Sequence, residues 1–173
     1  ALDLATGEII AFLDADDLAL PGGLARLIAA AAPTGASCGG QFLIDEPGSP
    51  MGREISPRCG QDRVVGVEQL RSGNAMGVGA VLIARDLLGN HRFNESLPVC
   101  EDWDLWLRLA GAGARFTALP AWMPPVKAYR VRAGSLSKKF TLMHDVGARV
   151  LRSAESFTGP IGSGLQGLAL GYG

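Results

Sequence analysis

The sequence of 173 residues has few of the side chains that build disulfide frameworks or soft-metal sites. It holds three cysteines, at positions 38, 59 and 100, without CxxC spacing, and two histidines. An odd number of dispersed cysteines argues against a disulfide framework and against a zinc site, and it indicates a reducing, cytoplasmic compartment. Any bound metal would therefore be a hard cation with oxygen ligands.

Long apolar runs and an excess of charge are also lacking. The longest apolar stretch, residues 24–32, is interrupted by Arg26 and is far shorter than the about 20 residues that cross a bilayer. Asp3 and Glu8 stand among the first residues, so a signal peptide is not expected. The 16 basic and 17 acidic residues give a net charge of −1, and no basic run stands out, so nucleic acid is not expected as a partner.

The hydrophobic pattern alternates between short apolar runs and segments of helical spacing, which predicts an α/β fold with a mostly parallel sheet. Residues 9–13 form a continuous apolar run, typical of a strand buried on both faces. We expect one domain over residues 1–152, followed by a Gly-rich, poorly ordered tail over 153–173. Further strands are expected at 41–44, 75–84, 115–119 and 126–131, helices at 21–32, 67–71, 101–110 and 140–152, and an exposed loop at 45–63.

Three carboxylates, Asp14, Asp16 and Asp17, follow the first predicted strand directly. They repel one another unless a cation or hydrogen-bond donors compensate them. Ligands of open α/β sheets gather at the carboxyl ends of strands, and carboxylates there suit Mg²⁺ or Mn²⁺ bound together with a diphosphate. Capping of the helix that follows is the alternative, but it accounts for at most one of the three acids.

A second acidic pair, Glu101 and Asp102, opens a segment of strong helical periodicity. Acids at a helix N-terminus are common because they oppose the positive end of the helix dipole. Trp103 and Trp106 share one face of this helix and are expected in the core, although an indole near a cleft can also stack on a sugar ring. This segment alone does not identify an enzyme.

Taken together, three segments resemble the catalytic domain of family 2 glycosyltransferases. GEIIAFLDADDLALPGGL resembles the stretch with the metal-binding DxD motif, FNESLPVCEDWDLWLRLAGAG the ED motif and its helix, and YRVRAGSLS the tyrosine–arginine segment that follows. They occur in the family's order along most of residues 5–137. The resemblance implies a GT-A fold, which is Rossmann-like, and inverting transfer from a nucleotide-diphosphate sugar to a hydroxyl of a saccharide, lipid or protein acceptor.

On the donor side, the resemblance assigns Mg²⁺ or Mn²⁺ to Asp16 together with Asp17, and places Asp14 against the nucleotide or sugar. Arg130 is expected as a cation near the diphosphate. Arg132 stands where relatives often have a histidine; a guanidinium cannot bind a metal but can pair with phosphate.

On the acceptor side, Asp102 matches the aspartate of the ED motif, which is the expected general base for the acceptor hydroxyl. Glu101 would support or orient this site. One acid cluster for metal and phosphate, with a separate acid for proton transfer, is the inventory that a single displacement requires.

Family members carry a nucleotide-binding half ahead of the DxD strand, whereas this chain begins at the helix just before that strand. We therefore expect the second half of a catalytic domain, a fragment of a longer protein. A truncated, non-catalytic remnant or a carbohydrate- or metal-binding module is the alternative, while a two-carboxylate glycoside hydrolase or a DxD phosphatase is less favoured. Peripheral association with the inner face of the cell membrane would suit the family.

Overall fold

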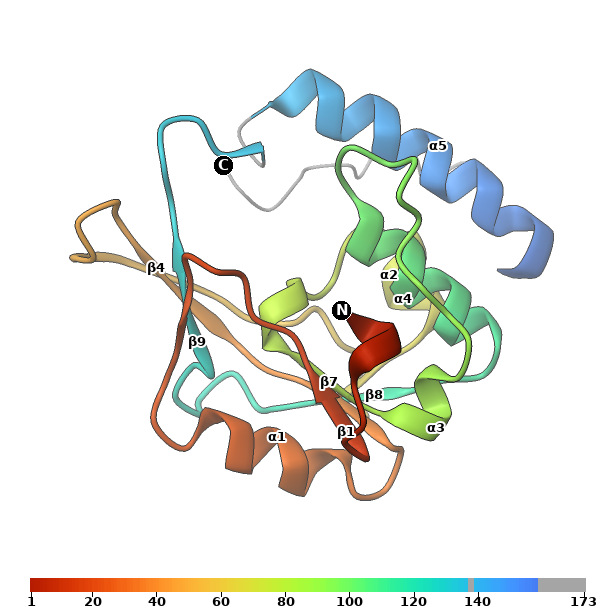
Figure 1. The fold of residues 1–173 in the computed structure, drawn as a ribbon, viewed down its shortest axis with the longest axis horizontal. Coiled ribbons are helices and arrows are strands. Elements are labelled where there is room, and N and C mark those ends of the chain that lie inside the picture. Colours follow the sequence, from red (N-terminus) through yellow and green to blue (C-terminus); the bar gives the residue numbers. More distant parts are fainter. Residues whose placement is uncertain (137–138, 159–173) are drawn as a thin grey trace.

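The structure is a computed structural model that describes residues 1–136 and 139–158. The chain folds into two β-sheets with helices packed around them (Figure 1). The strands are β1 (Ile9–Ala11), β2 (Leu18–Ala19), β3 (Ala36–Cys38), β4 (Gln41–Ile44), β5 (Pro50–Ile55), β6 (Val64–Val65), β7 (Val81–Ala84), β8 (Phe116–Ala118) and β9 (Lys127–Arg130). The helices are α1 (Gly23–Ala31), α2 (Val67–Arg71), α3 (Arg85–Leu88), α4 (Glu101–Gly111) and α5 (Phe140–Thr158), with 3₁₀ turns at Leu2–Leu4 and Val78–Ala80.

The larger sheet has the strand order β1-β7-β3-β8-β6, and the smaller one β2-β9-β4-β5. Within the described residues, β3 pairs with β8 and β4 with β9 in parallel, and the remaining pairs are antiparallel. The α/β class is confirmed, but the predicted mostly parallel sheet is wrong for this part of the chain. An apolar run does not reveal strand direction, because helices on both sides of a sheet bury antiparallel strands just as well.

Strand β7 shows why both faces of the larger sheet are apolar. Its side chains alternate between the faces, as in any strand. Val81 and Ile83 pack into the main core with α4, while Leu82 packs on the other side with Leu27 of α1. Helices α2, α4 and α5 accordingly lie on one side of the sheet and α1 on the opposite side (Figure 1).

Helix α4 supplies the centre of the main core. Trp103 and Trp106 are both fully buried, which confirms the core placement expected for this face. The Trp106 ring meets Phe12 and Phe116 edge-on, with ring centroids 5.6 and 5.7 Å apart. Because Phe12 lies two residues before Asp14, this aromatic cluster fixes the position at which the acidic segment leaves the sheet.

Three predictions about single elements need correction. Strand β1 is an edge strand that pairs only with β7 in the described residues, and Ile9 is 42% exposed, so β1 is not buried on both faces. The predicted loop at 45–63 contains β5, which the periodicity missed because almost all of its residues are exposed and it carries Gly52, Arg53 and Glu54. Helix α5 continues through residue 152 to Thr158, past the predicted domain boundary, and the rest of the predicted tail lies outside the described residues.

The other predicted segments agree with the structure to within a few residues. Strand β4 and helix α2 have the predicted bounds, whereas β7 is shorter than the predicted strand because a 3₁₀ turn occupies residues 78–80. No helix in the described part of the chain is both long enough and apolar enough to span a bilayer.

Candidate active site

The acidic segment lies between β1 and β2, and its three carboxylates have different surroundings. The side chains of Asp14 and Asp16 are 50% and 38% exposed, whereas that of Asp17 is completely buried. One of the three therefore serves the fold, and two remain open to a ligand.

Asp17 is held by strand β9. Its Oδ2 lies 2.5 Å from the Nζ of Lys127, a lysine that is itself 2% exposed, and its Oδ1 accepts a hydrogen bond from the backbone N–H of Arg130 at 2.9 Å. A buried carboxylate requires this kind of pairing, because an uncompensated charge away from water is very costly. Both oxygens of Asp17 are thus occupied, and the metal role predicted for it would require the pair with Lys127 to break.

The same strand and the residues after it supply cations to the other two acids. Lys127 Nζ lies 3.9 Å from Asp14 Oδ2, and Arg132 Nε lies 3.2 Å from Asp16 Oδ2. Burial raises the pKa of Asp14 and the neighbouring acids raise it too, while Lys127 opposes them by lowering it. The repulsion noted in the sequence is therefore largely compensated by protein cations.

The guanidinium of Arg130 donates hydrogen bonds to backbone carbonyls of the site. Its Nε donates to the carbonyl of Asp16 at 2.8 Å, and its Nη1 donates to the carbonyl of Glu46 at 2.7 Å. These bonds join the acidic segment to the turn after β4. For Arg130 to bind a diphosphate, as predicted, its guanidinium would have to give up these hydrogen bonds. The side chain of Arg132 is 48% exposed, so it can exchange its partner more easily.

The second acidic pair begins α4, at an unusual backbone position. Cys100, the residue before the helix, has a φ of 62°, a left-handed conformation that non-glycine residues rarely adopt. Such strain recurs at functional sites, where the surrounding structure holds it in place. Asp102 follows two residues later and is half-buried.

Asp102 is oriented by Asn74, which comes from the segment after α2. The Nδ2 of Asn74 donates to both Asp102 oxygens at 3.1 Å. Burial raises the pKa of Asp102 to about 6, with further increases from the charges of Glu101 and Asp14, while the hydrogen bond from Asn74 lowers it. The carboxyl thus has a pKa near neutrality, as a general base requires.

The structure brings the two acidic motifs together. Asp14 and Glu101 line one pocket of about 670 Å³, along with Phe12 and Phe93. This volume lies within the range of about 300–1,000 Å³ that is typical of ligand sites. The influence of Asp14 on the pKa of Asp102 shows that the two motifs also interact electrostatically.

Sequence reasoning missed Lys127 and Asn74. Lys127 is one of three lysines in the chain and stands in an otherwise apolar run, so its placement in a predicted strand was a signal for a buried partner. Asn74 had no signal, because it stands between Gly73 and Ala75 in a segment without periodicity.

The acidic segment is where a metal ion would be expected. Across residues 1–136 and 139–158, no three Asp, Glu, His or Cys side chains are grouped so as to hold a metal ion. Asp14 and Asp16 offer exposed carboxylate oxygens, which fits a cation that keeps several waters and shares the oxygens of a bound phosphate.

Comparisons with known proteins agree with this picture. The family model described as glycosyl transferase family 2 matches residues 1–87. A crystal structure of S. aureus TarS has 16% sequence identity and a TM-score of 0.51, over 87% of this chain and 26% of that one. The crystal structure of S. aureus TarS 1–349 in complex with UDP-GlcNAc has 14% identity and a TM-score of 0.53, over 91% of this chain and 48% of that one.

These similarities confirm the GT-A fold. The chain spans about a quarter to a half of the length of these two solved structures. No curated protein sequence matches it.

Proposed function

Because the chain belongs to glycosyl transferase family 2, we propose that it takes part in transferring a sugar from a nucleotide-diphosphate donor to an acceptor hydroxyl, with inversion and with the help of a divalent metal. The acceptor hydroxyl would belong to a saccharide, a lipid or a protein. One observation carries the proposal. Asp102, a carboxyl with a pKa of about 6, stands next to Glu101, and Glu101 lines the same pocket as Asp14 of the acidic segment.

Asp102 acts as the general base. With a pKa of about 6 it is ionised at neutral pH, yet it is a stronger base than an ordinary carboxylate. Asn74 holds both of its oxygens, which fixes the direction from which an acceptor hydroxyl can approach. Glu101 stays beside it as a second charge that favours proton uptake by Asp102.

The acidic segment forms the donor side. Asp16, with Asp14 beside it, would hold Mg²⁺ or Mn²⁺, and such an ion would neutralise the charge that develops on the departing diphosphate. Arg132 would leave Asp16 and pair with the phosphates, since its guanidinium is exposed and suited to bidentate contact. UDP-GlcNAc in the TarS 1–349 structure supports a nucleotide-sugar as the class of donor.

Calorimetry with Mn²⁺ and UDP tests the donor site. The chain should bind UDP only when Mn²⁺ is present, and Asp16→Ala should weaken that binding by more than about tenfold. Asp62→Ala is the matched control, because it breaks another exposed Asp–Arg pair with the same N–O distance of 3.2 Å and should leave UDP binding unchanged. Equal losses in the two variants would remove the acidic segment from the donor site.

A transfer assay tests the chemistry. Proton NMR of the product should show an anomeric configuration opposite to that of the donor, and Asp102→Asn should lower the rate by about 10²–10⁴. UDP binding without any turnover would instead favour the alternative function, a carbohydrate- or metal-binding module.

A further inference from the structure

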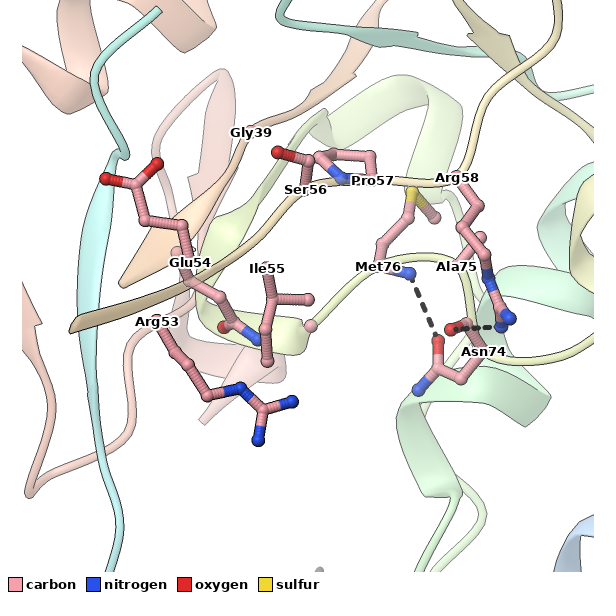
Figure 2. Close-up of a pocket in the computed structure, with 12 residues that line it drawn as sticks. Gly39, Arg53, Glu54, Ile55, Ser56, Pro57, Arg58, Asn74, Ala75 and Met76 are labelled. Carbon is pink, nitrogen blue, oxygen red and sulfur yellow. Dashed lines mark hydrogen bonds between the residues drawn. The ribbon is translucent and has the colours of Figure 1, made fainter. Parts of the chain in front are cut away.

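A second pocket, of about 280 Å³, lies apart from the one that holds Asp14 and Glu101. The end of β5 and residues 56–58 form one wall, and residues 74–77 form the other (Figure 2). The two pockets share no lining residue. The volume is close to the lower limit of about 300 Å³ for ligand sites, which suits one sugar residue better than a long chain.

Gln41 lines this pocket and carries a buried hydrogen-bond acceptor. The residue is only 3% exposed, and its Oε1 has no hydrogen-bond partner in the described structure. Gly77 faces it, and a Cβ at that position would lie 2.8 Å from Oε1. Because buried acceptors are almost always paired, a ligand that donates a hydroxyl proton to Oε1 would complete the site.

The open side of the pocket is positively charged. Arg53 and Arg58 both line it, and Arg58 donates to the carbonyl of Asn74 at 3.0 Å. Figure 2 shows the Arg53 guanidinium and the Asn74 side chain pointing toward the same open side, while the carboxylate of Glu54 points away from it. Guanidinium groups favour a carboxylate or a phosphate, which they bind bidentately.

Asn74 connects the pocket to the proposed chemistry. Its side chain belongs to the pocket wall, and its Nδ2 holds both oxygens of Asp102. A sugar in this pocket would therefore lie next to the residue that orients the general base. We propose that this pocket is the acceptor subsite and that it takes a saccharide bearing a carboxylate or phosphate group, an inference that rests on the proposed function.

Binding measurements with matched saccharides test this subsite. The probes are a galacturonate trisaccharide, its fully methyl-esterified form, and a maltotriose phosphate, each titrated into the chain without donor. The first and third should bind, and the neutral ester should bind about tenfold more weakly because it lacks the anion. Binding of only one acidic probe would support the proposal and would show whether the anion is a carboxylate or a phosphate.

Two variants address the two parts of the pocket. Arg53→Gln should weaken the acidic probes about tenfold and leave the ester unchanged, because it removes a charge-assisted bond. Gly77→Ala should weaken all three, since the added Cβ displaces the Gln41 amide while a φ of −80° leaves its backbone unstrained. Arg152→Gln, an exposed arginine on α5, is the matched control.

Titration of Mn²⁺ and UDP with the same variants separates this proposal from the proposed function. Retained UDP binding in Arg53→Gln and Gly77→Ala shows that both variants are folded. Equal binding of the acidic and neutral probes, or equal losses in Arg53→Gln and Arg152→Gln, would overturn the acidic acceptor even if UDP binds as expected. If the unaltered chain does not bind UDP, that result counts against the proposed donor site and not against the acceptor subsite.

Discussion

Replacing Asp102 with asparagine should stabilise the fold at pH 8 but not at pH 4. The pKa of this carboxyl rises from 3.8 to about 6 on folding, first because of burial. The folded state therefore keeps its proton at pH values where the unfolded chain has released it. The penalty that Asp102 places on folding is therefore largely absent below about pH 4, grows as the pH rises to about 6, and is constant above that.

The size of the effect follows from the same values. A pKa increase from 3.8 to about 6 corresponds to a penalty of about 3 kcal/mol at pH 8 and about 0.5 kcal/mol at pH 4, at 1.36 kcal/mol for each pH unit. Asparagine removes the penalty but loses one acceptor for Asn74, at a cost of about 1 kcal/mol. The variant should thus gain about 2 kcal/mol at pH 8 and lose about 0.5 kcal/mol at pH 4.

Thermal unfolding at the two pH values measures this difference. For a chain of this length, about 2.5 kcal/mol corresponds to a change in Tm of roughly 5–10 °C between the two conditions. Glu155→Gln, at an exposed position of α5, is the control and should show no such dependence. If Asp102→Asn shifts Tm equally at both pH values, burial and repulsion do not act on this carboxyl as argued.

Two further predictions concern residues that the sequence did not reveal. Lys127→Met should lower the free energy of unfolding by about 3–5 kcal/mol in urea, because it leaves the Asp17 carboxylate buried without its ammonium partner, and adding Asp17→Leu should recover much of the loss. A loss below about 1 kcal/mol in the single variant would contradict the buried pair. Asn74→Ala should raise the pKa of Asp102 above its present value of about 6, since it removes a hydrogen bond to the charged form, and carbon NMR of the carboxyl group measures this pKa. An unchanged or lower pKa would show that Asn74 does not stabilise the ionised carboxylate.

Much of the fold could be predicted because apolar periodicity reports burial. Helix α4 begins at Glu101 as its spacing predicted, and Trp103 and Trp106 are in the core. Strand direction could not be predicted, since a run such as β7 is equally apolar whether its neighbours are parallel or antiparallel. Strand β5 escaped notice because it is held by its pairing with β4 and not by burial.

The candidate site was predictable to a smaller extent. The acidic segment and Glu101–Asp102 stood out as clusters of charge, and the structure places Asp14 and Glu101 around one pocket. What distinguishes Asp17 from its neighbours is the position of Lys127, which is 110 residues away in the chain. The orienting role of Asn74 likewise depends on a contact across 28 residues, which local sequence does not encode.

The arrangement of β9 also limits how this protein can be dissected. The family model covers residues 1–87, yet the side chains that hold the acidic segment are those of Lys127, Arg130 and Arg132. A recombinant piece trimmed to the matched residues would keep all three aspartates and lose all three of these partners. Its acidic loop would then have no β9 to hold it, so the shortest stretch of this chain worth expressing for study of the acidic site extends at least through residue 132.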